Sequence, residues 1–240
     1  MKLLKKYGLA IFWILLFLDC LLINFKYFTI YRIYTKPLLL IVLAVYFYIN
    51  TRRSKHNRSK KIVYIGLLFT WLGDWCLLKN DFTSFYPKYQ DDISLIIGCI
   101  LLLAGFLMYT LLFKKMCVFN IKDCQEAFLA FLPMVLVSII FYKIISRVEI
   151  GVFKYIVILG IIIMTSMMVF AANVHHDKIR RNISIQFLIP GTITIVITMG
   201  IIVAHRFLLQ EADFLEAVIE LTYGFGQMLI LRGFTKYLKA

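Results

Sequence analysis

The sequence predicts an all-α polytopic membrane protein, a bundle of eight transmembrane helices with both termini in the cytoplasm. Apolar side chains make up 62% of the 240 residues and the mean hydropathy is +0.85, whereas soluble domains use about 45–50% apolar residues. The apolar stretches are nearly continuous rather than alternating, which is typical of membrane helices and not of barrel strands. We therefore expect residues 1–240 to form a single integral membrane domain.

The apolar runs define the expected helices, since a crossing needs about 20 apolar residues. The first run follows a basic start, but it contains Asp19 and no small-residue cleavage site, so we interpret it as a span and not as a signal peptide. The second, fifth and eighth runs are the weakest, because the second carries Lys36 before Pro37 and the eighth carries Glu220. In order, the eight runs are residues 7–25, 33–50, 62–78, 93–113, 127–142, 155–172, 183–204 and 217–231.

The basic residues predict the orientation. The net charge is +14, but Lys and Arg sit in short loops between the apolar runs, where they act as topology determinants rather than as a nucleic-acid surface. About twice as many of them fall on the side of both termini as on the other side, which places the termini in the cytoplasm. The basic loop 52–61 is expected to meet anionic membrane lipids. A bacterial inner membrane is the expected location, and an endoplasmic reticulum fits the same orientation.

Asp74 is the first candidate functional residue. It lies in the third run, IVYIGLLFTWLGDWCLL, directly after Gly73 and between Trp71 and Trp75, and it is the only charged residue of that run. A carboxylate in hydrocarbon costs several kcal/mol, so it usually faces a protein interior or a wet cavity. A water-poor setting also favours the protonated form of a carboxyl group. Asp74 is thus a candidate proton donor, and a structural acid paired with a neighbouring helix is the alternative.

Further polar residues fall at a similar depth on other runs. Four residues of the eighth run are spaced four, three and four apart, which places them on one helix face. One interpretation is hydrogen bonding between helices, with Glu220 paired to Lys36 or Arg206. The other is a polar pocket that opens toward the outer leaflet. The residues concerned are Asp19, Lys36, Asp74, Thr198, His205, Glu216, Glu220, Tyr223 and Gln227.

The sequence gives little indication of a metal site or a cofactor site. His56, His175 and His176 fall in loops and only His205 borders the bundle, so a three-histidine zinc site inside the membrane is not expected. The five cysteines show no paired spacing, and no nucleophile-elbow, phosphate-loop or dinucleotide motif is present. We expect no metal and no cofactor.

Several short motifs, taken together and in order, resemble the YhhN-like family of eight-helix membrane proteins, whose characterised members are lysoplasmalogenases. The resemblance covers most of the chain. Two positions depart from the family pattern: Phe106 stands where the family has His, and Met199 stands where it has the second of two aspartates. The matching motifs are Lys36-Pro37-Leu38, Gly73-Asp74-x-x-Leu77, Gly105-x-x-x-Tyr109, Gly191 followed by Arg206-Phe207, and Thr222-Tyr223-x-x-x-Gln227.

The resemblance implies hydrolysis of the vinyl ether bond of lysoplasmalogens to a fatty aldehyde and a glycerophospho-ethanolamine or -choline. Such chemistry uses an acid that protonates carbon and a carboxylate that stabilises the oxocarbenium ion, as in glycosidases. Asp74 suits the first role, and Glu220 or Asp19 would take the second. Lys36 suits the substrate phosphate and Tyr223 and Gln227 the glycerol hydroxyl. Thr198, His205 and Tyr109 complete the expected substrate-binding set.

Two alternatives to hydrolysis stay open at this point. A catalytically inactive relative would keep the pocket and bind or transport single-chain lipids such as lysophospholipids. A small-solute carrier is the third possibility, although the chain has no evident inverted repeat and no pair of broken helices. The oligomeric state is not indicated.

Overall fold

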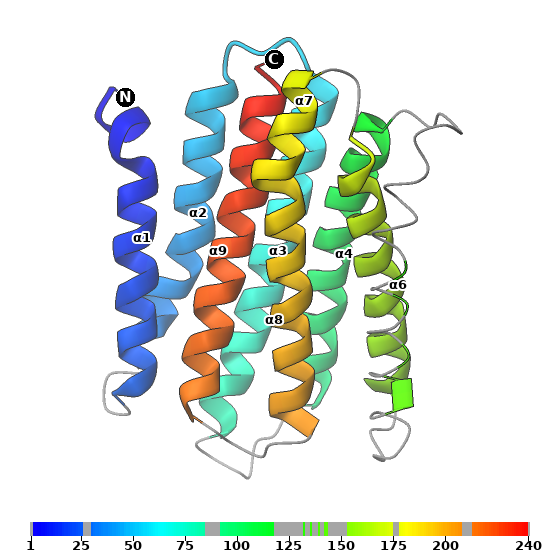
Figure 1. The fold of residues 1–240 in the computed structure, drawn as a ribbon. Coiled ribbons are helices and arrows are strands. Elements are labelled where there is room, and N and C mark those ends of the chain that lie inside the picture. The colour runs from blue at the N-terminus through cyan, green and yellow to red at the C-terminus, as the bar shows by residue number, and fades with distance from the viewer. Residues whose placement is uncertain are drawn as a thin grey trace.

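The structure, a computed structural model, is a bundle of long helices whose two termini lie at the same end (Figure 1). It describes residues 2–25, 30–84, 92–117, 153–174, 178–207 and 213–239, together with residues 132, 135, 139, 142 and 143. Seven spans in these parts of the chain are long and apolar enough to cross a membrane. The protein is therefore a multi-pass integral membrane protein built from helices.

The seven spans overlap seven of the eight predicted runs, and the run at 127–142 lies almost entirely outside the described residues. The seventh run is the longest span, since α7 and α8 continue into one another through a π-helical turn. The helices are α1 (Lys2–Asn24), α2 (Arg32–Thr51), α3 (Asn57–Ser84), α4 (Asp92–Met116), α6 (Phe153–Ala172), α7 (Lys178–Ile183), the π-helical turn (Ser184–Leu188), α8 (Ile189–Phe207) and α9 (Asp213–Tyr237).

The π-helical turn lies next to Pro190. Proline has no N–H, so the carbonyl one turn earlier, at Gln186, loses its usual partner in the ladder. The turn that contains Gln186 is wound as a π-helix, a form found mostly as single turns within α-helices. The hydroxyl of Ser184 donates to the carbonyl of Ala171 at 2.5 Å, which ties this turn to the end of α6.

Glycines let α3 and α4 approach closely. Gly66 and Gly73 on α3 are seven residues apart, as are Gly98 and Gly105 on α4, so each pair lies along one face. A Cβ at Gly73 would come 3.0 Å from the Gly98 carbonyl oxygen, and one at Gly66 would come 3.3 Å from the Gly105 carbonyl oxygen. Membrane helices pack closely at such small residues. The contact fixes the rotation of α3, and Asp74, next to Gly73, faces α2 and α9.

The α9 helix lies deepest in the bundle. Half of its span is buried, the largest share among the seven spans, and it contacts α1, α2 and α8. The eighth run was a weak prediction because Glu220, one of several polar residues on this helix, lies within a short apolar run. Because these residues are enclosed by neighbouring helices, the polar face of α9 becomes the interior of the protein and not its lipid-facing surface.

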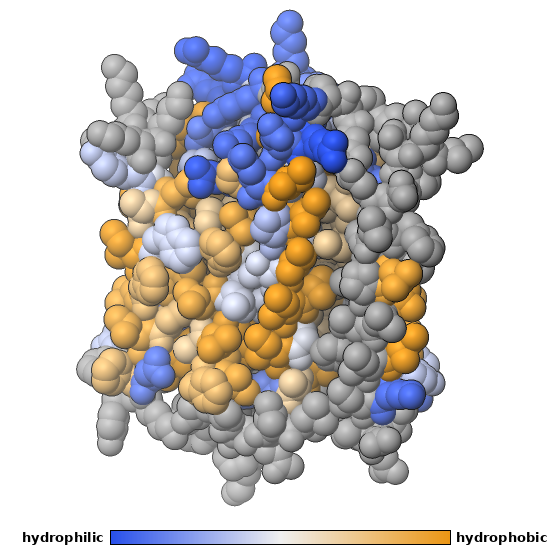
Figure 2. All heavy atoms as spheres, viewed as in Figure 1, coloured by the Kyte–Doolittle hydropathy of each residue, from blue (hydrophilic) through white to orange (hydrophobic). Residues whose placement is uncertain are grey.

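The outer surface has an apolar band with many hydrophilic side chains at one end and a few at the opposite end (Figure 2). The end that carries the termini also carries exposed basic side chains at the ends of α4, α7 and α9 and in the connection between α2 and α3. The opposite end holds the start of α2 and the start of α9. Assignment of the basic end to the cytoplasm follows from the positive-inside rule and stays a prediction.

Candidate functional site

A cluster of charged side chains is buried where α2 and α9 begin, at the end opposite the termini (Figure 1). Arg32 and Lys36 are four residues apart on α2, and Glu216 and Glu220 are four apart on α9, so each pair shares a helix face. Lys36 Nζ lies 3.0 Å and Arg32 Nη2 3.4 Å from Glu220 Oε2, while Arg32 Nη1 lies 3.9 Å from Glu216 Oε2. The predicted pairing of Glu220 with Lys36 is therefore confirmed.

Asp19 joins this cluster from α1. The Thr35 hydroxyl donates a hydrogen bond to Asp19 Oδ1, and Arg32 Nε lies 3.5 Å from Asp19 Oδ2. Asp19 is fully buried and Arg32 is 2% exposed, so this pair has little screening by water. Three carboxyl groups thus surround two cations, and the cluster holds one acidic group more than it has basic groups.

Asp74 lies beside this cluster but not in direct ionic contact with it. Its side chain is 5% exposed, and the Tyr223 hydroxyl donates to Asp74 Oδ2 at 3.3 Å. Asp74 lines a void of about 10 Å³ together with Lys36, Glu220, Tyr223 and Gln227, which is about the smallest volume that holds one water molecule. The carboxyl group is therefore enclosed in a small polar compartment between α2, α3 and α9.

A second hydrogen bond extends this compartment toward α4. Tyr109 is fully buried, and its hydroxyl donates to Gln227 Oε1 at 3.2 Å. The other polar atom of that amide, Gln227 Nε2, is buried and has no hydrogen-bond partner in the described part of the chain. The α9 residues Glu220, Tyr223 and Gln227 therefore present a row of polar groups to Lys36, Asp74 and Tyr109 in turn.

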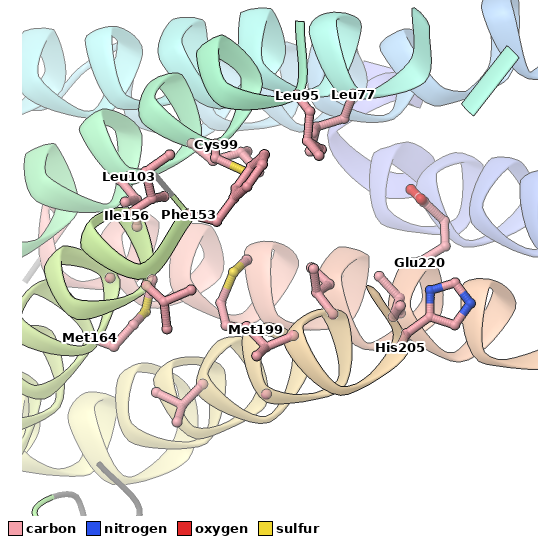
Figure 3. Close-up of a pocket in the computed structure, with 18 of the residues that line it drawn as sticks. Leu77, Leu95, Cys99, Leu103, Phe153, Ile156, Met164, Met199, His205 and Glu220 are labelled. Carbon is pink, nitrogen blue, oxygen red and sulfur yellow. The ribbon is translucent and has the colours of Figure 1, made fainter. Parts of the chain in front are cut away.

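A larger cavity of about 240 Å³ begins on the other side of Lys36 and Glu220. Its polar lining comes from Arg32, Lys36, His205, Glu216 and Glu220, and its remaining walls are almost entirely apolar. Figure 3 shows Glu220 and His205 at one end of the cavity and apolar residues of α4 and α6 at the other. The apolar walls include Leu95, Cys99 and Leu103 of α4, Phe153, Gly160 and Met164 of α6, and Val196, Met199 and Val203 of α8.

The other predicted residues divide between this cavity and the helix contacts. His205 lines the cavity, is 9% exposed, and its Nε2 has no hydrogen-bond partner among the described residues. Thr198 instead holds α8 to α9, since its hydroxyl lies 2.8 Å from that of Thr222. Asp19 lines neither void. The side chain of Arg206, the other partner considered for Glu220, is outside the described residues.

Arg32 is the main residue that the sequence interpretation missed, because the predicted second run began one residue later, at Ile33. The structure places it at the start of α2 with 2% of its surface exposed. One signal was available: Arg32 and Lys36 repeat the four-residue spacing of Glu216 and Glu220 with opposite charge. Two complementary pairs at helical spacing favour facing helices.

The described residues contain no group of three or more His, Cys, Asp and Glu side chains that could hold a metal ion. Such a group is what a transition-metal site would need. The polar groups of the site are instead paired acids and bases, tyrosine hydroxyls and an amide. An arrangement of this kind can bind a charged headgroup and transfer protons.

Comparison with known families gives one decisive result: the YhhN family model matches residues 31–234. The chain belongs to the YhhN family. Neither the curated proteins nor the solved structures contain a match. The matched region includes α2, α3, α4 and α9 as far as Phe234, and therefore every residue of the site described above except Asp19. Phe106 is buried in the core and Met199 lines the large cavity.

Proposed function

We propose that this YhhN-family protein is a lysoplasmalogenase-like hydrolase that cleaves the vinyl ether bond of a lysoplasmalogen. The observation that supports the proposal is a pair of buried carboxyl groups, Asp74 and Glu220, that share a small void with Lys36 beside an apolar cavity. Enzymes that cleave acetal-like bonds divide the work between two such carboxyl groups. Family membership supports the same reaction class.

The reaction needs a proton on carbon first. In the proposed mechanism Asp74 donates a proton to the outer carbon of the vinyl ether, which leaves an oxocarbenium ion on the carbon next to oxygen. The Glu220 carboxylate stabilises this positive charge electrostatically. Water adds to the cation and gives a proton back to the Asp74 carboxylate, and the resulting hemiacetal collapses to a fatty aldehyde and a glycerophospho-ethanolamine or -choline.

The charged cluster suits the headgroup. Arg32 and Lys36 offer donors to a phosphate, and an arginine can bind it through two parallel hydrogen bonds. Lys36 and Glu220 line both voids, so they form the partition between the cavity and the compartment of Asp74. A phosphate that attracts Lys36 would loosen its 3.0 Å contact with Glu220 and open the way to Asp74. Tyr223 and Gln227 then lie near the glycerol hydroxyl.

One observation favours a second function, the binding or transport of single-chain lipids without catalysis. Met199 gives the cavity wall a thioether at the position where the resembled family has an aspartate, and Asp74 does not line the large cavity. If Glu220 does not take the place of that aspartate, no carboxylate stabilises the oxocarbenium ion and the reaction is not catalysed. A protein of this kind would retain the lipid and release no aldehyde.

The Asp74→Asn variant distinguishes the hydrolase from a protein that binds or transports lipid without catalysis. We expect purified protein in detergent to release fatty aldehyde from a lysoplasmalogen, and the variant to lose at least about 100-fold in rate, a typical contribution of a positioned acid. Lipid retention should stay near the wild-type level, because the amide keeps the shape of the side chain. Retention by the wild-type protein with no aldehyde would refute the hydrolase and support the lipid binder.

Matched carboxyl-to-amide variants assign the second role. Glu220→Gln should lower turnover by about 100-fold, whereas Asp19→Asn, which changes a buried acid outside both voids, should lower it by less than about tenfold. Size-exclusion profiles check that each variant remains folded. A larger loss with Asp19→Asn than with Glu220→Gln would transfer the role to Asp19.

A further inference from the structure

The length of the apolar part of the large cavity can be measured along each of three helices, α4, α6 and α8. The cavity has His205 and Glu220 at its polar end and Leu103 and Met164 at its far end (Figure 3). At about 1.5 Å per residue, the apolar lining covers roughly 12 Å along α4 from Leu95 to Leu103, 16 Å along α6 from Phe153 to Met164 and 10 Å along α8 from Val196 to Val203. These lengths are between about a third and a half of the roughly 30 Å hydrocarbon core of a bilayer.

Gly160 of α6 lines this apolar part and differs from the glycines that hold helices together. A Cβ at Gly160 would meet Leu103 Cδ2 at 3.4 Å, which is an ordinary van der Waals distance. At Gly73, by comparison, a Cβ would come 2.9 Å from Leu102 Cγ, too close for any real contact. Gly160 is thus not required for close packing of α6 on α4, and its missing side chain leaves space inside the cavity.

The position of Gly160 along α6 shows which part of the cavity that space belongs to. It lies seven residues, or about 10 Å, from Phe153 near the mouth and one turn, or about 6 Å, from Met164 at the far end. A side chain at residue 160 would therefore obstruct the inner third of the cavity and leave the charged end unchanged. Arg32, Lys36 and Glu220 belong to α2 and α9, so a change on α6 does not alter their pairing.

We infer that the cavity between α4, α6 and α8 binds the single hydrocarbon chain of a lipid whose charged headgroup meets Arg32 and Lys36, and that Gly160 sets the chain length it accepts. The inference specifies the substrate class of the site proposed above. It rests on that proposed function only in taking the charged end of the cavity as the end that binds the headgroup. A volume of about 240 Å³, lined by apolar side chains and about one leaflet deep, fits one chain.

Chain-length selection follows from burial. Each methylene that enters the cavity from water contributes about 0.8 kcal/mol, or roughly a fourfold gain in affinity. Retention should therefore rise with chain length until the chain reaches Met164 and should not rise beyond it. A side chain at residue 160 excludes the last methylenes of the lipid chain. The longest chain that fits therefore becomes shorter by about 6 Å, the distance from Gly160 to Met164 along α6.

The test uses lysophosphatidylcholines, whose ester-linked chains are not substrates for vinyl ether cleavage. Purified wild-type protein, Gly160→Ala and Gly160→Leu are equilibrated in detergent with an equimolar mixture of saturated chains of roughly 8 to 18 carbons, which bracket one leaflet. Retained lipids are then quantified by mass spectrometry. Ile162→Phe adds bulk to the same helix on a side chain that is 57% exposed and serves as the matched control.

We expect a maximum in the wild-type profile and a shift toward shorter chains that is small for Gly160→Ala and at least tenfold in the long-to-short ratio for Gly160→Leu, with no shift for Ile162→Phe. A flat wild-type profile, or equal profiles for wild type and both Gly160 variants, would overturn the inference. The outcome is separate from catalysis. Chain selection without aldehyde release supports the inference and refutes the hydrolase, whereas aldehyde release with no effect of Gly160 does the reverse.

Discussion

Arg32 connects more of the site than any other described residue, since it lies within 4 Å of carboxyl oxygens of Asp19, Glu216 and Glu220. Two of these partners, Asp19 and Glu220, are themselves almost fully buried. Removal of one partner from a buried ion pair leaves an uncompensated charge, which costs more than the pair contributes. The stability of the headgroup end therefore depends on Arg32.

Arg32→Gln is expected to destabilise the protein by about 3–5 kcal/mol, seen as a lower apparent Tm in detergent. Lys61→Gln removes a positive charge from an exposed side chain of α3 and should change the Tm little. The double variant Arg32→Gln with Asp19→Asn should recover part of the loss, because the amide no longer needs a counter-charge. No recovery in the double variant would show that Arg32 acts through packing and not through charge.

The sequence indicated which residues form the site, but it did not indicate which of them contact one another. The four-residue and three-residue spacing of Glu220, Tyr223 and Gln227 predicted a shared face, and the structure brings all three to one compartment with Asp74. The hydrogen bond between Tyr223 and Asp74 joins residues 149 positions apart, and no local pattern specifies such a pair. The separation of Asp74 from the large cavity likewise depends on how α2 meets α9.

At the scale of helices, the contact between α3 and α4 sets the direction of Asp74. A Cβ at Gly73 would come 3.0 Å from the Gly98 carbonyl oxygen and the Leu102 amide nitrogen, and backbone atoms cannot move aside as a flexible side chain can. The helices must separate or rotate to accept it. Either movement also displaces the residue that follows Gly73.

Gly73→Ala is therefore expected to cost about 1–3 kcal/mol, the usual range for overpacking, and to reduce lipid turnover through Asp74. Gly160→Ala makes the same chemical change in a helix where the new methyl group has room, so it is the matched control and should keep the wild-type Tm. An equal Tm for both variants would mean that α3 and α4 are not in the close contact described above.

Helix prediction from hydropathy succeeded for a physical reason, because each backbone polar group in a bilayer must be satisfied within its own helix. Seven predicted runs overlap described helices, and even the run with Glu220 does so. The limits of the helices were less accurate. The α3 helix continues to Ser84, past the predicted end at Leu78, since a helix does not stop where its apolar residues stop.

For the whole molecule, the two ends of the bundle differ in charge, and the charged cluster of the proposed site lies at one of them. The termini and the exposed basic side chains share one end, and the charged lining of the cavity, where the Glu216 side chain is 43% exposed, lies at the other. If the basic end is cytoplasmic, as the positive-inside rule predicts, the site opens toward the outer leaflet. The side of the membrane from which lipid enters is therefore linked to the orientation of the termini.

Cysteine labelling of intact cells tests this orientation. A cysteine at Ile30, which is 58% exposed in the connection between α1 and α2, should react with a membrane-impermeant maleimide added outside, whereas a cysteine at Lys55 in the connection between α2 and α3 should react only after permeabilisation. Both are measured in a variant whose native cysteines are replaced by alanine or serine and which retains the wild-type Tm. The reverse pattern would place the cavity mouth in the cytoplasm and direct the search for substrate to the inner leaflet. A bilayer provides lipid on both faces, so the labelling result decides which leaflet supplies the hydrocarbon chain whose length Gly160 is inferred to limit.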